Sequence, residues 1–262
     1  MTRPIVFLTD YGLTDEFVGI CHGVIARIAP DARVIDLSHT IPRQDVMRGA
    51  LTLARATPYM PDDAVYVAVV DPGVGSDRRS IVVRTRSGAD LVGPDNGLLS
   101  LAWQALGGAV VAADIASPLV TLETSAKTFH GRDVFAPASA WLATGFPIEE
   151  LGPPVDLASV HVLDLPRPMV TPGAIGARVS GIDGFGNVQL NATPDDLQTA
   201  GLDGDVIRVL GRRVPLVGVF ADLPEHGLGM IVDAQGHLAL VVNRGSAADR
   251  LAVSEGSAVV LE

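Results

Sequence analysis

The sequence predicts an α/β protein, with an N-terminal mainly parallel α/β sandwich domain and a smaller C-terminal antiparallel, β-barrel-like domain. Up to about residue 150, short apolar runs alternate with runs of helical spacing, as expected of βαβ units. A proline-rich stretch follows, and glycine-punctuated β-type runs then continue through residue 261. Short strands at such spacing are typical of a small antiparallel β-domain.

In the N-terminal part, the short apolar runs are expected to be strands and the helix-spaced runs to be helices. Strands are expected at 5–8, 34–37, 65–70, 81–84 and 90–92, and helices at 17–28, 45–56 and 98–106. Asp45 stands near the start of the second helix, where a carboxylate interacts favourably with the helix dipole. Strands that alternate with helices indicate a mainly parallel sheet covered on both faces.

The domain boundary is expected at 164–172, where the segment DLPRPMVTP holds three prolines. Proline lacks an N–H and fits neither a helix interior nor a central strand, so this segment is predicted to be a linker. The domains are therefore 1–163 and 173–262. In the second, β-type runs lie at 174–182, 188–191, 206–209, 214–219, 230–232, 238–242 and 258–261.

The composition and charge of the chain exclude several classes of partner and site. Of the 262 residues, 48% are hydrophobic and 19% charged, and the net charge is −11. The apolar content predicts a sizeable core, and the acidic balance argues against nucleic acid or anionic membranes as partners. The only cysteine, Cys21, excludes an intrachain disulfide and a cysteine-based zinc site, and is interpreted as a core residue. No run approaches the roughly 18 apolar residues of a spanning helix, so we expect a soluble cytoplasmic protein.

Three polar loops follow predicted strands, where open α/β sheets bind ligands. In LTDYG, Asp10 could accept hydrogen bonds from a ribose diol or serve as a turn residue. In VVDPGVGSDRR, Asp71 ends a strand and Arg78 follows seven residues later, so the two form either a site or a structural ion pair. The Gly-x-Gly piece here lacks the rest of a phosphate-binding motif.

The third loop, KTFHGRDVFAP, carries His130. Histidine titrates near neutral pH and can position water, although a structural role stays open from this residue alone. The second domain adds the segments GIDGFGN at 181–187, VFAD at 219–222 and VNRGSAA at 242–248. The first of these is equally well a glycine-rich hairpin turn.

Together these segments resemble the S-adenosylmethionine hydroxide adenosyltransferase family, the hydrolase relatives of fluorinase and of the S-adenosylmethionine-dependent chlorinase. The resemblance extends over essentially the whole chain. Its carriers are FLTDYG at 7–12, DLSHTIPRQDV at 36–46, VVDPGVGSDRR at 69–79, PDNGLL at 94–99, TFHGRDVFAPASA at 128–140, IDGFGNVQLN at 182–191 and NRGSAA at 243–248.

The resemblance implies roles for particular residues. Asp71, Arg78 and His130 match the family's three residues that hold the attacking water or hydroxide, and Asp10 matches the aspartate that binds the ribose hydroxyls. In the second domain, the residues implied to bind substrate are Asp183 and Asn187 at its amino-acid end, Phe220 on the adenine, and Asn243 with Ser246 in the adenine-facing loop. The resemblance also implies a homotrimer with sites at subunit interfaces.

The halogenase branch differs at telling positions. The halogenase branch is less similar to this chain than the hydrolase branch is. It has tyrosine in place of Asp71, an aromatic residue in place of His130 and, in fluorinase, a serine in place of Gly131. A carboxylate at Asp71 would repel a halide. The expected activity is therefore hydrolysis of S-adenosylmethionine to adenosine and methionine, without a metal or cofactor.

Three alternatives remain at this point. The chain could be a halide-using S-adenosylmethionine transferase of the chlorinase or fluorinase kind. It could be a non-catalytic protein that binds adenosine or S-adenosylmethionine. Its Asp- and His-rich loops also leave open a metal-dependent phosphoesterase.

Overall fold

The computed structural model describes residues 2–123, 127–202 and 204–262. The chain divides into two compact units, Met1–Leu163 and Asp164–Glu262, and each has its own hydrophobic core. In the described ranges, no helix is long and apolar enough to cross a membrane.

The first unit is built on a six-stranded mixed sheet of order β2-β1-β3-β5-β4-β6. Its strands are β1 (Ile5–Thr9), β2 (Val34–Ser38), β3 (Val65–Val69), β4 (Ser80–Thr85), β5 (Asp90–Pro94) and β6 (Ala109–Asp114). β1 pairs in parallel with β2 and β3, and β3 with β5. β4 is antiparallel to both of its neighbours. The predicted α/β class with a parallel-containing sheet is confirmed.

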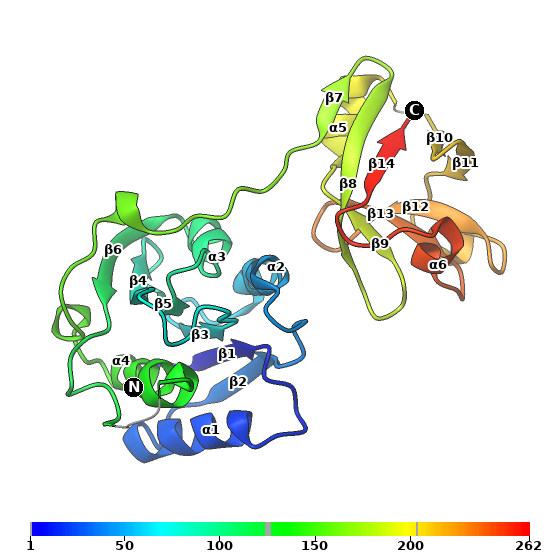
Figure 1. Ribbon diagram of the computed structural model, residues 1–262. Coiled ribbons are helices and arrows are strands. Elements are labelled where there is room, and N and C mark those ends of the chain that lie inside the picture. The colour runs from blue at the N-terminus through cyan, green and yellow to red at the C-terminus, as the bar shows by residue number, and fades with distance from the viewer. Residues whose placement is uncertain (1, 124–126, 203) are drawn as a thin grey trace. The chain divides into compact units, whose positions relative to one another are not determined.

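Helices cover both faces of this sheet (Figure 1). On one face α1 (Phe17–Ile28) packs beside α4 (Ala136–Ala143), and on the other α2 (Val46–Ala56) packs beside α3 (Ser100–Ala105). Alternate residues of each strand point to the two faces, so Phe7 enters the core under α1 whereas Leu8 enters the core under α2. Cys21 lies buried in the first of these cores, and burial raises the pKa of its thiol to about 12. It therefore acts as an uncharged packing residue.

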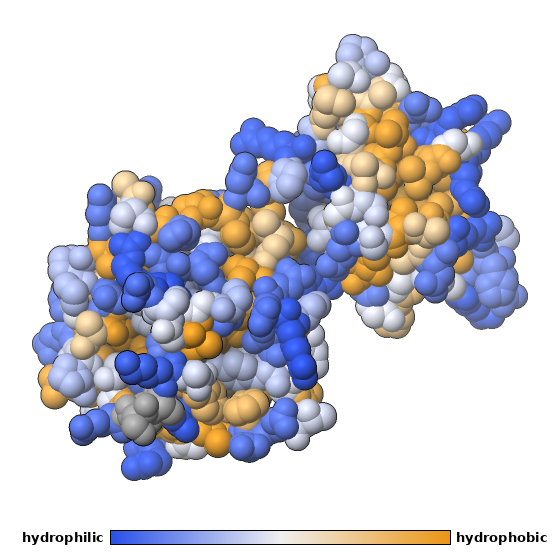
Figure 2. Space-filling view, viewed as in Figure 1, coloured by the Kyte–Doolittle hydropathy of each residue, from blue (hydrophilic) through white to orange (hydrophobic). Residues whose placement is uncertain are grey.

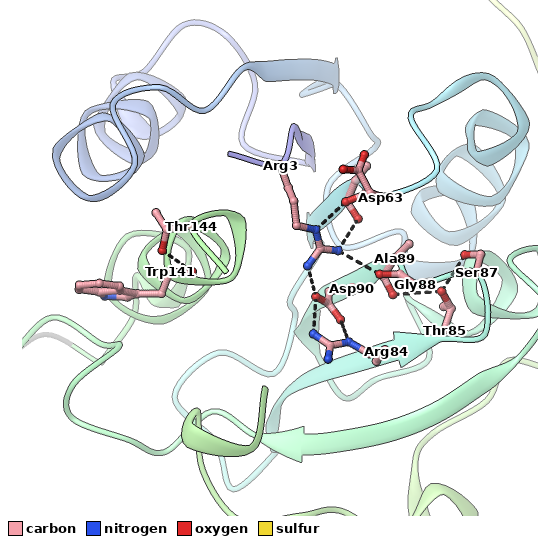
Figure 3. A network of polar contacts seen from close by, with 11 residues as sticks. Arg3, Asp63, Arg84, Thr85, Ser87, Gly88, Ala89, Asp90, Trp141 and Thr144 are labelled. Atoms are coloured by element: carbon pink, nitrogen blue, oxygen red, sulfur yellow. Dashed lines mark hydrogen bonds and ion pairs between the residues drawn. The ribbon is translucent and has the colours of Figure 1, made fainter. Parts of the chain in front are cut away.

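A buried carboxylate, Asp90, joins three segments of the first unit (Figure 3). Its side chain is fully buried and accepts from Arg3 Nη1 at 2.5 Å and from Arg84 Nε at 2.8 Å. Arg3 Nε also donates to the Asp63 carbonyl at 2.6 Å. Two guanidinium groups thus compensate one buried charge, as burial of a carboxylate requires.

The second unit is a β-structure of order β11-β10-β14-β8-β9-β13-β12, with β7 paired to β8. The ladders between the described strands of this unit are antiparallel, whereas the isolated bridge between Leu216 and Met230 is parallel. A bridge between Leu216 and Met230 connects the two ends of this order, so the sheet is nearly closed into a barrel, as predicted. The strands are β7 (Met169–Thr171), β8 (Ala174–Ile182), β9 (Val188–Leu190), β10 (Val206–Val209), β11 (Arg212–Pro215), β12 (Leu228–Val232), β13 (Leu238–Val242) and β14 (Ala258–Leu261).

The structure corrects two details of the second unit. Part of the expected linker, Met169–Thr171, is the strand β7. Prolines flank this short strand without interrupting it. Among the described strands it pairs with β8 alone, so it tolerates them as edge strands do. The strand expected at 214–219 ends at Pro215, because the chain beyond it turns into the short 3₁₀ helix Phe220–Asp222.

Two helices lie where only β-type runs and loops were expected. They are α5 (Pro194–Ala200) and α6 (Ala247–Leu251). α5 begins with a capping box formed by Thr193 and Asp196, the reciprocal arrangement that satisfies the free N–H groups of a first turn. It ends at Gly201, which has a φ of 70° that glycine adopts without strain.

Candidate active site

Asp10 and Asp71 leave the sheet at the same edge. β1 and β3 run parallel, with Thr9 opposite Val69, so the residues that follow both strands emerge side by side. The Asp10 N–H still donates to the Val69 carbonyl at 3.4 Å. The predicted position of these carboxylates beyond the carboxyl ends of parallel strands is therefore what the structure shows.

Arg78 folds back onto Asp71 from the loop between β3 and β4. Its Nε donates to Asp71 Oδ1 at 2.9 Å and its Nη2 to Asp71 Oδ2, a bidentate pair that fixes the carboxylate in orientation as well as position. Only 10% of the Arg78 side chain and 6% of the Asp71 side chain are exposed. The loop is tight, because Gly75 has a φ of 81° and a Cβ there would lie 3.1 Å from the Lys127 carbonyl oxygen.

The same guanidinium also contacts His130. Arg78 Nη2 lies 2.7 Å from His130 Nδ1, and Arg78 Nη1 donates to Ser80 Oγ at 2.8 Å and to the Arg79 carbonyl at 3.2 Å. A guanidinium has five N–H donors, and protein acceptors therefore take all five. Arg78 holds Asp71 and His130 in place but keeps no donor for a bound ligand.

This contact assigns the protonation of His130. A guanidinium can only donate, so Nδ1 of His130 must accept and the ring proton sits on Nε2. Burial and then the charge of Arg78 hold the pKa of His130 below 6.5, against the raising effects of Asp71 and Asp133. His130 is consequently a neutral imidazole near pH 7 that presents an Nε2–H donor.

A π-helical turn, Gly131–Phe135, carries His130 at its start and continues into α4. Such turns are rare and are frequent at functional sites. Arg132 and the buried Asp133 pair with each other, through Nε at 2.6 Å and Nη2 at 2.9 Å. Phe135 packs edge-on against the His130 ring, with the ring centroids 6.3 Å apart, and so supports its orientation.

Asp10 has one oxygen engaged. Its Oδ2 accepts from the Gln44 N–H at 2.8 Å, and Gln44 adopts a φ of 64° to present that N–H. Among the described residues no donor contacts the other oxygen, Oδ1. Asp10 thus holds Gln44, 34 residues along the chain, with one oxygen and leaves the other open. This long-range contact is not the local turn of the competing interpretation, and the ribose role stays a prediction.

In the second unit, Asp183 and Asn187 close one loop. Asp183 Oδ1 accepts from the Phe185 N–H at 2.9 Å and the Asn187 N–H at 3.0 Å, and Oδ2 accepts from Asn187 Nδ2 at 2.8 Å. Ser246 lies against this loop, since a Cβ on Gly186 would be 2.3 Å from its Oγ. The structure therefore brings these three predicted residues together, within the hairpin turn that was the competing interpretation.

The other two predicted residues of this unit are linked through a turn. Phe220 begins the turn Phe220–Asp222 and its side chain is 40% exposed. Asn243 Nδ2 donates to the Leu223 carbonyl at 2.8 Å, directly after that turn. Asn243 thus holds the segment that presents the aromatic ring, while its side-chain oxygen accepts no hydrogen bond from a described residue.

One group of three possible metal ligands, His22, Asp36 and His39, occurs in the described part of the chain. Nε2 of His22 and Nε2 of His39 lie 2.8 and 2.9 Å from Asp36 Oδ1, and His39 Nδ1 lies 2.9 Å from Thr9 Oγ1. Sequence reasoning missed this network because its members are spread over three elements. It braces Thr9, the residue before Asp10.

Comparison with known proteins identifies the family of this chain. Residues 5–152 match the N-terminal domain of the S-adenosylmethionine (SAM) hydroxide adenosyltransferase family, and residues 177–260 match its C-terminal domain. The chain is 49% identical over 257 residues to the (R)-S-adenosyl-L-methionine hydrolase of Salinispora arenicola, covering 97% of this chain and 96% of that protein. It is 31% identical over 280 residues to the fluorinase of Nocardia brasiliensis, covering 94% and 92%.

A solved structure shares the fold. It is the crystal structure of an uncharacterized conserved protein from Thermotoga maritima, with a TM-score of 0.91, 34% identity and coverage of 98% of this chain and 99% of that one. Both domains of the family are thus present in one chain, in the order of its relatives. This chain belongs to the SAM hydroxide adenosyltransferase family.

Proposed function

We propose that this protein hydrolyses S-adenosyl-L-methionine to adenosine and L-methionine by attack of an enzyme-held water on C5′. The observation that carries the proposal is the single guanidinium of Arg78, which fixes a carboxylate, Asp71, beside a neutral imidazole, His130. A relative that is 49% identical bears the name of this activity. The negative charge of Asp71 also favours water over a halide.

The reaction needs a placed nucleophile more than an activated leaving group. The water oxygen forms a bond to C5′ while the C5′–S bond breaks. The electron pair of the broken C5′–S bond stays on sulfur and converts the sulfonium into the neutral thioether of methionine. One water proton passes to a base and then to solvent, and the other stays on the 5′-hydroxyl of adenosine. Holding water in line with the C–S bond supplies on the order of 7–11 kcal/mol.

Three residues divide this work. Asp71 accepts the water proton, because its carboxylate oxygens keep lone pairs beyond those that accept from Arg78. His130 donates its Nε2–H to the water oxygen and leaves a lone pair to attack. Arg78 acts through the other two residues, since its own donors are all taken by protein acceptors.

Substrate binding is proposed for the remaining predicted residues. Asp10 Oδ1 accepts from the ribose hydroxyls, and Asp183 contributes negative charge toward the ammonium group of the methionine part. Asp183 already accepts three hydrogen bonds, so its role is chiefly that of a fixed charge. Phe220 packs on the adenine, and Asn187, Asn243 and Ser246 complete the polar contacts.

We further propose a cytoplasmic homotrimer that needs no metal or cofactor, with the second unit of one subunit serving the site of another. Exposed apolar side chains of the second unit support an assembly. They gather around β14 (Figure 2), and Val260 is 44% exposed there. Phe185, between Asp183 and Asn187, is 83% exposed. Sedimentation velocity tests the trimer, and a monomer in solution at assay concentration would contradict it.

The decisive assay incubates purified protein with SAM and separates the products by chromatography. The (R) form named for the relative and the (S) form are assayed separately. Adenosine and methionine should appear in equal amounts, and reaction in ¹⁸O-water should place the label in the adenosine 5′-hydroxyl. A halogenated adenosine in chloride or fluoride would assign the halide reaction instead. Binding of SAM without release of any product would indicate a non-catalytic binding protein. Loss of activity with a chelator would indicate a metal-dependent enzyme.

A further inference from the structure

Tyr11 lies directly against Gly131, the residue after His130. A Cβ added to Gly131 would be 2.0 Å from the Tyr11 hydroxyl oxygen and 3.0 Å from its Cζ. Real side chains do not tolerate a contact of 2.0 Å, since close-packed interiors leave carbon atoms about 3.5–4.0 Å apart. Gly131 is therefore a glycine because the Tyr11 hydroxyl occupies the space that a side chain would need.

The position of the Tyr11 ring is fixed from several sides. Phe17 and Phe129 pack edge-on against it, with centroids 5.9 and 5.7 Å away, and they also pack edge-on against each other at 5.2 Å. The Tyr11 N–H donates to Thr9 Oγ1 at 3.2 Å. A ring held in this way presents its hydroxyl at one place, beside the turn that carries His130.

The hydroxyl is protonated and has no protein partner in the described part of the chain. Burial, then Cys21, Asp10 and Asp71, raise the pKa of Tyr11 well above its ordinary value, and Arg78 opposes them. The charges of Asp71 and Arg78 thus act on this oxygen. Tyr11 is only partly buried, so its hydroxyl stands open beside the candidate site, where a ligand atom can serve as its hydrogen-bond partner.

We propose that Tyr11 is a third residue that contacts the attacking water, beside Asp71 and His130, and that position 131 is glycine to leave room for the Tyr11 hydroxyl. The inference rests on the proposed hydrolysis. Asp71 takes one water hydrogen and His130 donates to the water oxygen, which leaves the second hydrogen without an acceptor. The Tyr11 oxygen accepts that hydrogen, which is the one that stays on the adenosine 5′-hydroxyl. With all three contacts the water keeps one free lone pair, directed at C5′.

The test is a double-mutant cycle on positions 11 and 131, read as kcat, KM and unfolding temperature. Tyr11→Phe should lower kcat on the order of tenfold, the value of one neutral hydrogen bond, with KM and unfolding temperature unchanged. Gly131→Ala should lower kcat more where Tyr11 is present than together with Tyr11→Phe, because that change removes the oxygen at 2.0 Å and leaves only the milder contact with Cζ at 3.0 Å. Tyr59→Phe is the matched control, since Tyr59 is 74% exposed, and should change nothing.

The outcomes separate this proposal from the proposed function. If the unaltered protein releases no adenosine from SAM, the proposed function itself fails. If it is active and Tyr11→Phe keeps its kcat, or the cycle is additive, the role of Tyr11 is wrong. A fall in kcat that accompanies a lower unfolding temperature in Tyr11→Phe would assign a packing role and would also overturn the proposal.

Discussion

Two buried carboxylates of the first unit, Asp71 and Asp90, are both paired with arginine, yet they lie at opposite edges of one sheet. Asp90 begins β5, and two guanidinium groups hold it with no side-chain exposure (Figure 3). Asp71 follows the carboxyl end of β3, and one guanidinium holds it together with His130. Burial and an arginine therefore do not mark a site. What distinguishes the candidate site is a third, titratable partner, His130, at the edge of the sheet where ligands bind.

The largest contrast is expected from Asp71→Asn. Loss of the proton acceptor should reduce turnover by about 10²–10⁴-fold, while adenosine affinity changes little. The unfolding free energy should fall by less than in Asp90→Ala, since the amide oxygen still accepts one of the two Arg78 hydrogen bonds. Steady-state release of adenosine measures the first quantity and urea unfolding the last. Turnover within a few-fold of the unaltered protein would remove Asp71 from the mechanism.

Asp90→Ala should show the reverse pattern. It leaves Arg3 and Arg84 without their buried partner, and breaking such a pair costs about 3–5 kcal/mol of unfolding free energy. The activity of the molecules that remain folded should be unchanged. Urea unfolding monitored by Trp fluorescence measures the loss, and a cost below about 1 kcal/mol, as for a surface pair, would contradict the structural role.

Asp10 is a third carboxylate for this comparison. It lies at the same edge of the sheet as Asp71, but its hydrogen-bond donor is the Gln44 backbone N–H and not an arginine. In Asp10→Asn the amide oxygen can still accept from the Gln44 N–H, so this hydrogen bond is kept while the charge is lost. A charged hydrogen bond to the ribose is worth about 1.5–3 kcal/mol, and adenosine affinity should fall about 10- to 150-fold. Unchanged affinity in calorimetry would count against the ribose role.

The smallest effect is expected from pH. Because the pKa of His130 is held below 6.5, kcat should be constant above that value and fall by about tenfold per unit below the lowered pKa. Protonation puts a hydrogen on Nδ1 and ends the contact with Arg78. The unfolded chain binds this proton more readily, so the stability contribution is complete above pH 6.5 and is lost as the pH falls toward the lowered pKa. His130→Gln should abolish the step in the kcat profile, and a persisting step would assign it to another group.

Local pattern predicted most of the first unit and the loops of its site. The alternation of apolar and helical runs predicts β1, β3 and α1 almost to the residue. It did not indicate α5, because TPDDLQTAG is short and lies among β-type runs, although Thr193 and Pro194 are helix-start signals. β6 was missed because an alanine-rich run after two glycines has no clear period.

The chemistry of the site was harder to predict than its position. That Asp71 and Arg78 pair follows from a short loop between strands, but the five acceptors of Arg78 include Ser80 and a backbone carbonyl. The tautomer of His130 follows from its contact with Nη2 of this guanidinium. The contact between Tyr11 and Gly131 joins positions far apart in the chain, and no periodicity relates them. The roles of the nine predicted site residues stay predictions until they are measured.

The π-helical turn Gly131–Phe135 makes the site sensitive to chain length. A π-turn amounts to one extra residue in an α-helix, and α4 beyond it is anchored in the core through Ala138 and Leu142. Because the turn absorbs that extra residue, His130 keeps its phase relative to α4, whereas deleting a residue from α4 itself would rotate His130 by about 100° relative to the core residues beyond the deletion. Such a deletion would move the imidazole away from Arg78 while the core residues beyond it kept their places, so the length of this segment is a constraint on the site.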